Sequence, residues 1–175
     1  MSNFTITYTL TAEQYAEGAS KAGLALKSDG KAKAVRVGIT ELVGGVLGLF
    51  FIKQSPVLLL FVLISLAMGL YSLSFYPIIF PRSIRKKSYQ RFNKGPAANN
   101  PITIILGEDG LFSQVAQEQV ELDYSKLTAI ISKDVLVLTS NNWSAVVPRQ
   151  SIGDQQFTDL TEALAAKPLA GKISI

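Results

Sequence analysis

The chain has 175 residues, of which 48% are hydrophobic and 17% charged, and its formal net charge is +4. It contains no cysteine and no histidine. This composition excludes disulfides, thiolate nucleophiles, Cys/His zinc sites and every mechanism that needs a histidine proton carrier within the chain. The length fits one ordinary domain, or a membrane hairpin with one small domain.

The charge is unevenly distributed along the chain. Residues 1–100 carry 12 basic and 4 acidic side chains, a balance of +8, whereas residues 101–175 carry 5 basic and 9 acidic side chains, a balance of −4. The basic side chains gather beside two apolar runs, where anionic lipid head groups would attract them. This distribution favours a membrane surface over nucleic acid as the partner of the basic half.

The first 34 residues predict a strand followed by a helix on the cytoplasmic side. Residues 4–10 alternate apolar side chains with threonine, which is typical of a strand with one buried face. Thr11 and Gln14 stand at capping-box spacing and predict a helix start. The apolar stripe of this helix consists of Tyr15, Ala19, Ala22 and Leu26. Its end is expected near residues 28–30, and no apolar segment of a signal peptide is expected in residues 1–34.

Two apolar runs, residues 37–52 and 57–80, are separated by only four residues, 53–56. The second run has no charged residue in 24 positions. At about 1.5 Å per residue it would extend roughly 36 Å as a helix, enough to cross a hydrocarbon core of about 30 Å. The sequence therefore predicts a transmembrane helical hairpin over residues 35–81, with helices at about 35–52 and 57–80.

The basic residues predict the orientation of this hairpin, because lysine and arginine near helix ends stay on the cytoplasmic side. Only Lys53 lies in the connecting loop. The basic residues outside the loop are Lys21, Lys27, Lys31, Lys33 and Arg36 before the first helix, and Arg82, Arg85, Lys86, Lys87, Arg91 and Lys94 after the second. We therefore expect a multi-pass protein of the cell (inner) membrane with both termini in the cytoplasm.

Gly44 and Gly48 form a GxxxG pattern in the first apolar run, with Gly45 beside them and Gly38 earlier on the same helix. Small residues at this spacing let two helix backbones approach closely. One interpretation is that they pack the first helix on the second within one chain. The other is that they mediate a homo-oligomer.

Glu41 is the only acidic residue in either apolar run. A carboxylate in lipid is costly and is a functional candidate by default. Its position near the cytoplasmic start of the helix also permits contact with the interface or pairing with Arg36. The alternatives are thus an interfacial pair or a polar site on a proton or cation path. Farther along, Tyr71, Tyr76 and the 75–80 region suggest an interfacial aromatic belt, and Pro77 and Pro81 are expected to kink or end the second helix.

Residues 82–100 are expected to form a basic juxtamembrane segment followed by a Gly/Pro/Asn-rich linker. Four side chains are candidate contacts for anionic lipid: Arg82, Arg85, Lys86 and Lys87. Surface anchoring explains this cluster without a specific ligand, and no motif points to recognition of one particular lipid.

Residues 101–148 contain several short apolar segments with turn signals between them, including Asp109-Gly110. This pattern predicts an antiparallel β-meander or partial barrel. A helix is expected at about 154–166, with Phe157, Leu160 and Leu164 on its buried stripe. The resulting α+β fold has a cytoplasmic, pleckstrin-homology-like (PH-like) domain over residues 101–167, capped by its C-terminal helix, and a tail at residues 168–175.

The order of these elements resembles the YcxB-like family of small bacterial membrane proteins with two transmembrane helices. The resemblance lies in residues 9–15, the central hairpin, residues 102–111 and 122–127, and the segment 145–149 before the terminal helix. It implies the hairpin-plus-sheet architecture, and it implies no catalytic residues.

No active-site motif stands out. Asp123-Tyr124-Ser125-Lys126 contains a serine and a lysine, but their adjacency favours a capped turn over convergence on one substrate atom. We therefore expect a non-catalytic, membrane-anchored binding or scaffold module without cofactor or metal. Its expected partners are an anionic bilayer, a protein partner or further copies of the chain, and no nucleic acid. The alternative is a small oligomeric transport or channel component built from several hairpins around Glu41.

Overall fold

A computed structural model describes residues 4–51, 56–141 and 143–175 of the chain. The chain divides into two compact units. The helical unit comprises Leu26–Ser83, and the sheet unit comprises the segment up to Ala25 together with Ile84–Ile175. The sheet unit is therefore discontinuous in sequence, and the helical unit is inserted within it.

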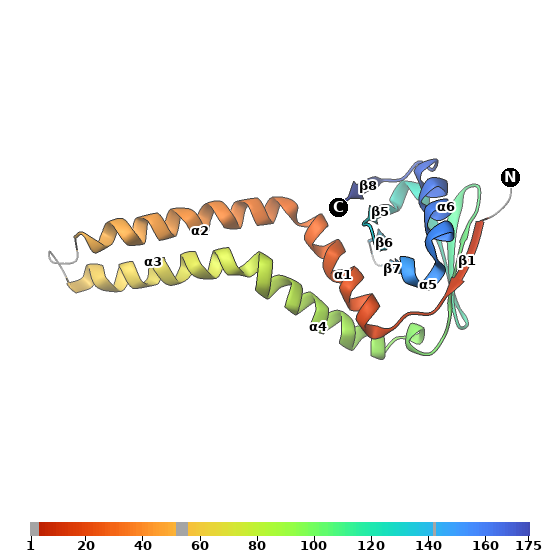
Figure 1. Ribbon diagram of the computed structural model, residues 1–175, viewed down its shortest axis with the longest axis horizontal. Helices are drawn as coiled ribbons and strands as arrows, with labels where there is room; N and C mark the ends of the chain where they lie inside the picture. Colours follow the sequence, from red (N-terminus) through yellow and green to blue (C-terminus); the bar gives the residue numbers. More distant parts are fainter. Residues whose placement is uncertain (1–3, 52–55, 142) are drawn as a thin grey trace. The chain divides into compact units, whose positions relative to one another are not determined.

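The helical unit consists of an antiparallel helix pair, α2 (Ser28–Leu49) and α3 (Pro56–Ser74), which lie side by side (Figure 1). Small residues form the seam between them. A Cβ on Gly38 would lie 2.8 Å from Leu73 Cγ and 3.1 Å from the Gly69 carbonyl oxygen, and a Cβ on Gly45 would lie 2.7 Å from Leu66 Cδ2. The two backbones approach closely because glycine leaves this space empty.

The helix boundaries differ from those expected. α2 begins at Ser28 instead of at residue 35, because the Lys-Ala-Lys-Ala segment at residues 31–34 consists of good helix formers and continues the helix. The expected end of this helix at residue 52 lies outside the described residues. The second helix also continues past residue 80, through the π-helix η2 (Phe75–Ile79) into α4 (Phe80–Asn93).

Pro77 and Pro81 are accommodated within this continuous helix and do not end it. Pro77 lies in η2, whose wider turn relieves the clash of a proline ring with the preceding turn. Pro81 is the second residue of α4. The helix therefore continues beyond the apolar run that ends at residue 80, and the first part of the basic segment extends it to Asn93.

The helical pair is present, but a membrane span is indicated for only one of its helices. Within the described parts of the chain, one continuous helix, Val57–Asn93, is long and apolar enough to cross a membrane. Only 11% of its apolar window is buried. α2 does not meet the same criterion; it carries Lys31, Lys33, Arg36 and Glu41.

The first sheet of the sheet unit is antiparallel, with strand order β1-β2-β3-β4. Its strands are β1 (Phe4–Tyr8), β2 (Ile102–Leu106), β3 (Gly110–Val115) and β4 (Glu118–Asp123). β1 pairs with β2 in the register Phe4↔Leu106 to Tyr8↔Ile102. The N-terminal strand thus completes the sheet that follows the hairpin in sequence, a point that the sequence left open.

The second sheet has the strand order β7-β6-β5-β8. Its strands are β5 (Thr128–Ile131), β6 (Val135–Ser140), β7 (Trp143–Pro148) and β8 (Gly171–Ser174). The strand pairs within residues 101–148 are antiparallel, as expected, whereas β8 pairs in parallel with β5, so residues 171–174 belong to the sheet and not to the expected tail. The segment is held because Leu169 and Ile173 pack against the core and the Ala170 N–H donates to the carbonyl of Leu127 at 2.9 Å.

Helices complete the sheet unit. They are α1 (Ala12–Leu26), the short turns η3 (Pro96–Ala98) and η4 (Tyr124–Lys126), α5 (Arg149–Ile152) and α6 (Asp154–Ala165). The predicted capping box is confirmed, because the Gln14 N–H donates to Thr11 Oγ1 at 3.2 Å and the Thr11 N–H donates to Gln14 Oε1 at 3.0 Å. Phe157, Leu160 and Leu164 of α6 are buried in one core with both sheets, as their spacing predicted.

The expected stripe of α1 was only partly correct. Ala22 is buried, but Leu26 is 53% exposed. The buried positions are Ala16, Gly18, Ser20 and Ala22. Gly18 is required here because a Cβ at this position would overlap the side chain of Val146 on β7. This face of α1 is small and partly polar, so a search for large apolar side chains does not find it.

The seam of the helix pair gives a first prediction. Gly38→Leu should destabilise the helix pair by about 1–3 kcal/mol, because the new side chain meets the Gly69 carbonyl and Leu73. Gly44→Leu is the matched control: no atom lies within 4 Å of a Cβ there, and removing glycine from a helix should be neutral or stabilising. Denaturant titration of the detergent-solubilised chain, followed by circular dichroism, measures both. Equal losses from the two substitutions would contradict this seam.

A second prediction concerns Tyr8, a buried core residue whose hydroxyl has no hydrogen-bond partner among the described residues. Burial raises the pKa of Tyr8 above its ordinary value of 10.0. Above that pH the unfolded chain releases the phenolic proton while the folded chain keeps it, so stability falls as the pH rises. Tyr8→Phe should reduce this loss by up to about 1.4 kcal/mol per pH unit.

The measurement is the free energy of unfolding of wild type and Tyr8→Phe across alkaline pH. Tyr89→Phe, which removes the hydroxyl of an exposed tyrosine, serves as the control. A Tyr8→Phe variant that loses stability above pH 10 as steeply as the wild type would show that Tyr8 is not the group responsible.

Candidate functional site: apolar helix pair and charged groove

The exposed apolar side chains of the chain are concentrated on the helical unit. Among the described residues, all exposed large apolar side chains except Tyr89, Val120 and Ile175 lie between Leu26 and Ile79. On α3 they face in several directions, with Leu60, Phe61, Leu63 and Ile64 all more than half exposed. A helix that is apolar on every side is suited to a core or to lipid, and this helix is not covered by its own chain.

One end of the helix pair carries a cluster of aromatic side chains with a lysine beside it, called the aromatic cluster below. Tyr71, Phe75, Tyr76 and Phe80 form a chain of ring contacts with centroids 5.3–5.9 Å apart. Lys27 Nζ lies 5.2 Å from the centre of the Phe80 ring. The Tyr76 hydroxyl fits against Gly30, where any Cβ would overlap it. The aromatic cluster has the composition of an interfacial aromatic belt.

The seam uses only half of the predicted glycine pair. A Cβ on Gly48 would lie 2.6 Å from Val62 Cγ2, so Gly48 packs on α3. Gly44 has nothing within 4 Å of a Cβ position, so it does not pack on α3, and its alternative role in a homo-oligomer stays a prediction. The residues that accompany Gly48 are Gly38, Gly45 and Gly69. Gly38 and Gly45 are separated by seven residues, which keeps both on the helix face that packs on α3.

Glu41 is engaged inside the helix pair. Its Oε2 accepts a hydrogen bond from the Ser65 hydroxyl on α3. The partner is therefore Ser65, and not Arg36 as the sequence suggested; the Arg36 carbonyl accepts a hydrogen bond from Thr40 Oγ1 at 3.0 Å. The carboxylate acts as a polar link between α2 and α3 at a part-buried position.

The four candidate lipid-contact residues are all exposed on α4. Arg82 belongs to the helical unit, whereas Arg85, Lys86 and Lys87 belong to the sheet unit. Arg85 and Lys86 line a groove between α1 and α4 with a volume of about 610 Å³. Lys87 does not line this groove.

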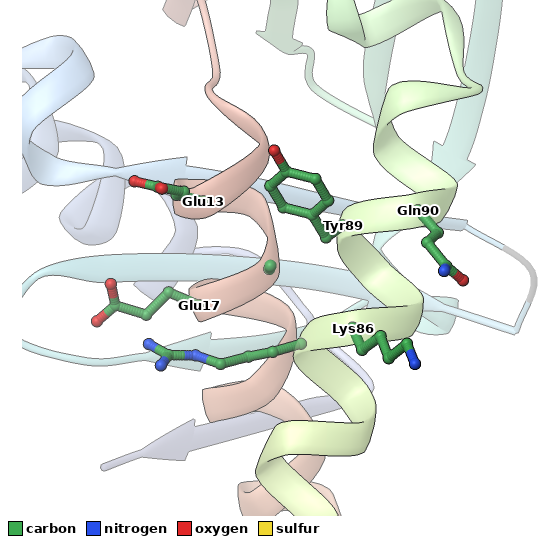
Figure 2. A pocket seen from close by; sticks show the side chains of 7 residues that line it. Glu13, Glu17, Lys86, Tyr89 and Gln90 are labelled. Atoms are coloured by element: carbon green, nitrogen blue, oxygen red, sulfur yellow. The ribbon is translucent and has the colours of Figure 1, made fainter.

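The groove has an acidic side and a basic side. From α1 it is lined by Glu13, Ala16 and Glu17, and from α4 by Arg85, Lys86, Tyr89 and Gln90. Figure 2 shows the Tyr89 ring directed toward α1, with Glu13 and Glu17 extending on one side and Lys86 and Gln90 on the other. Glu13 and Glu17 were not among the expected site residues; their i, i+4 spacing on one helix face was the available signal.

Two contacts hold α1 in place beside this groove. The rings of Tyr15 on α1 and Phe92 on α4 lie 5.3 Å apart, and Phe92 is buried. Lys21 Nζ lies 3.1 Å from Glu17 Oε1 and 3.9 Å from Asp134 Oδ2 in the β5–β6 turn. α1 is thus fixed to both α4 and the second sheet, so the two sides of the groove keep their spacing.

The residues that looked most like chemistry form structural caps. The Ser125 N–H donates to Asp123 Oδ1 at 2.7 Å, and this hydrogen bond lowers the pKa of Asp123. The Tyr124 hydroxyl donates to the Gly107 carbonyl at 3.0 Å, and burial raises its pKa. The segment 123–126 is therefore a capped turn, as predicted.

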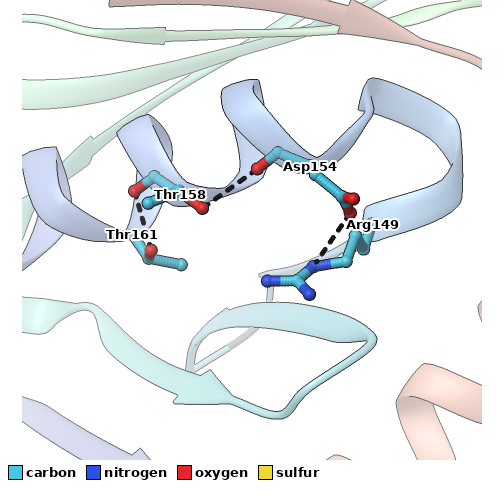
Figure 3. A network of polar contacts seen from close by, with 4 residues as sticks. All are labelled: Arg149, Asp154, Thr158 and Thr161. Carbon is cyan, nitrogen blue, oxygen red and sulfur yellow. Dashed lines mark hydrogen bonds and ion pairs between the residues drawn. The ribbon is translucent and has the colours of Figure 1, made fainter.

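Arg149 also has a structural role. Its Nε lies 3.6 Å from Asp154 Oδ1, and its guanidinium carbon lies 4.8 Å from the centre of the Phe157 ring. Figure 3 shows this pair at the start of α6, followed by Thr158 and Thr161, whose hydroxyls donate to the carbonyls of Asp154 and Thr158 at 3.0 and 2.8 Å. Within the described residues, no group of three or more carboxylates could hold a metal ion.

A scan against protein-family models, a search of curated proteins and a search of solved structures each found no match to this chain.

Glu41 and Ser65 give a third prediction. Ser65→Ala should destabilise the helix pair by about 1–2 kcal/mol, because it leaves a part-buried carboxylate without this donor. Glu41→Gln should keep the pair, because the amide oxygen can still accept the hydrogen bond. It should also leave proton flux across reconstituted vesicles unchanged. Denaturant titration and a pH-sensitive dye measure the two outcomes, and a changed flux would instead favour the channel alternative.

Proposed function

We propose that this chain is a membrane-anchored, non-catalytic binding module, in which the α2–α3 pair lies in the bilayer and the sheet unit faces the cytoplasm. The observation that carries the proposal is the exposed apolar surface of the helix pair. This pair carries nearly all the exposed large apolar side chains of the described residues. In solution these side chains would be in contact with water, which is unfavourable. Lipid covers such a surface without that cost.

The dimensions of α3 fit a bilayer. Residues 57–74 extend about 27 Å as a helix, close to the roughly 30 Å of a hydrocarbon core. The aromatic cluster of Tyr71, Phe75, Tyr76 and Phe80 lies at the C-terminal end of this helix. In the proposed arrangement this aromatic cluster lies at the head-group level.

The register of the helix pair makes α2 compatible with the same depth. Because Gly38 packs beside Leu73 in an antiparallel pair, Arg36 lies level with about Phe75. The charged beginning of α2 is therefore level with the aromatic cluster, and the apolar part of α2 is level with the apolar part of α3. This match supports a two-helix hairpin in the membrane, although α2 alone is not apolar enough to indicate a span.

The basic residues support the orientation. Six lysines and arginines follow α3 within residues 82–94, whereas the connecting segment contains Lys53 alone. By the positive-inside rule, the end of the helix pair that carries the aromatic cluster lies on the cytoplasmic side of the cell (inner) membrane, together with both termini.

The sheet unit supplies the binding part of the proposal. Its two sheets and the buried stripe of α6 share one core, an arrangement that supports a PH-like assignment. Its polar clusters are explained by caps and turns, which supports binding over catalysis. The resemblance to YcxB-like membrane proteins implies the same architecture, and membership of that family stays a prediction.

Membrane integration and topology give the fourth prediction. The chain should remain in the membrane pellet after alkaline carbonate extraction. It has no native cysteine, so single cysteines report their own exposure. Ser55→Cys, outside the described residues, should react with an impermeant maleimide in intact spheroplasts. Thr9→Cys, at an exposed position after β1, should react only after lysis.

The outcomes separate the two parts of the proposal. Release of the chain by carbonate would overturn the anchor. Labelling of Thr9→Cys in intact spheroplasts would overturn the orientation and leave the anchor standing.

A further inference from the structure

We propose that the groove between α1 and α4 binds the zwitterionic head group of an aminophospholipid, with phosphate on Arg85 and the primary ammonium on Glu13. This inference rests on the proposed function, because it takes its ligand from the bilayer in which the helix pair is anchored. It names a lipid class that the basic cluster alone does not distinguish.

The charge of the groove favours a zwitterion over an anion. Its lining contains two carboxylates, Glu13 and Glu17, and two cations, Arg85 and Lys86. Glu17 is already paired with Lys21, so Glu13 is the carboxylate that would repel an anionic head group, whereas a net-neutral head group with both charges can pair with Glu13 and with Arg85 at once. The volume of about 610 Å³ falls within the range of small-molecule sites.

Three of the four charged side chains are available to a ligand. Glu17 is paired with Lys21 at 3.1 Å. In the described part of the chain, neither Glu13 nor Arg85 nor Lys86 has an ion-pair partner within 4.0 Å. The Arg85 guanidinium can bind two phosphate oxygens with two parallel N–H donors in one plane, a geometry that an ammonium group does not offer.

The acidic side favours a primary ammonium over a trimethylammonium. A carboxylate accepts hydrogen bonds from a primary ammonium, which has three N–H donors, whereas a trimethylammonium has none. Tyr89, 45% exposed in the groove, offers its ring face to either cation and so does not discriminate between them. Glu13 is therefore the residue that should select phosphatidylethanolamine over phosphatidylcholine.

The fifth prediction is tested on the full chain in detergent, with equimolar phosphatidylethanolamine, phosphatidylcholine and phosphatidylglycerol carrying the same acyl chains. Native mass spectrometry counts the bound lipids. The wild type should retain phosphatidylethanolamine about fivefold over each of the other two, the effect of one charge-assisted contact. Glu13→Gln should bring the ethanolamine-to-choline ratio close to one.

Two further variants locate the phosphate contact. Arg85→Gln should reduce the retention of phosphatidylethanolamine and phosphatidylcholine together, because both carry the phosphate. Lys87→Gln removes a neighbouring positive charge on α4 that does not line the groove, and it should change neither ratio. Circular dichroism confirms that each variant is folded.

Several results would overturn the assignment. They are a wild-type ethanolamine-to-choline ratio of one, an unchanged ratio in Glu13→Gln, a preference for phosphatidylglycerol, or displacement of the lipid by soluble phosphoethanolamine at the same concentration. The last result would indicate a free metabolite as the ligand. A chain that resists carbonate extraction but shows no lipid preference would overturn the groove assignment alone, whereas a chain released by carbonate would overturn the anchor.

Discussion

The glycine seam of the α2–α3 pair determines much of the architecture of this chain. Gly38, Gly45 and Gly69 let the two backbones pack closely, so the pair needs few large side chains in its interior. The large apolar side chains consequently point outward, and among the described residues of the helix pair Val62 is the only one of them that is buried. A seam of this type costs nothing in lipid, where outward apolar side chains are solvated, but it leaves the pair unstable in water.

The sheet unit is built around the insertion of this pair. β1 and α1 precede it in the sequence, and α4 and the remaining strands follow it. The pairing of β1 with β2 and the stacking of Tyr15 on Phe92 both join segments from before and after the insertion. The charged groove arises from the same joining, because one side comes from α1 and the other from α4.

Elements that rest on local chemistry could be predicted from the sequence. The capping box at Thr11, the turn at Asp109-Gly110 and the apolar stripe of α6 each depend on residues a few positions apart. Features that depend on distant partners could not. β8 is a four-residue strand with little apolar content, and it exists because β5 offers a parallel edge to it.

The candidate site shows the same division. The exposure of the basic residues on α4 and the apolar character of α3 follow from composition. The packing of the seam glycines, the Glu41–Ser65 hydrogen bond and the meeting of Glu13 and Arg85 in one groove depend on helix register and on helix–helix pairing. Pro77 was misleading for a local reason, because a π-helical turn absorbs a proline that would end an ordinary α-helix.

The position of β1 before the inserted helices also sets the order in which the paired strands are synthesised. During synthesis β1 and α1 leave the ribosome first, and their sheet partner β2 is made only after both inserted helices. Until then the apolar face of β1, with Ile6 and Tyr8, has no strand to pair with. During that interval β1 presents an unpaired strand edge, the kind of surface that chaperones and proteases act upon. Closure of the first sheet therefore has to wait until both inserted helices have been made.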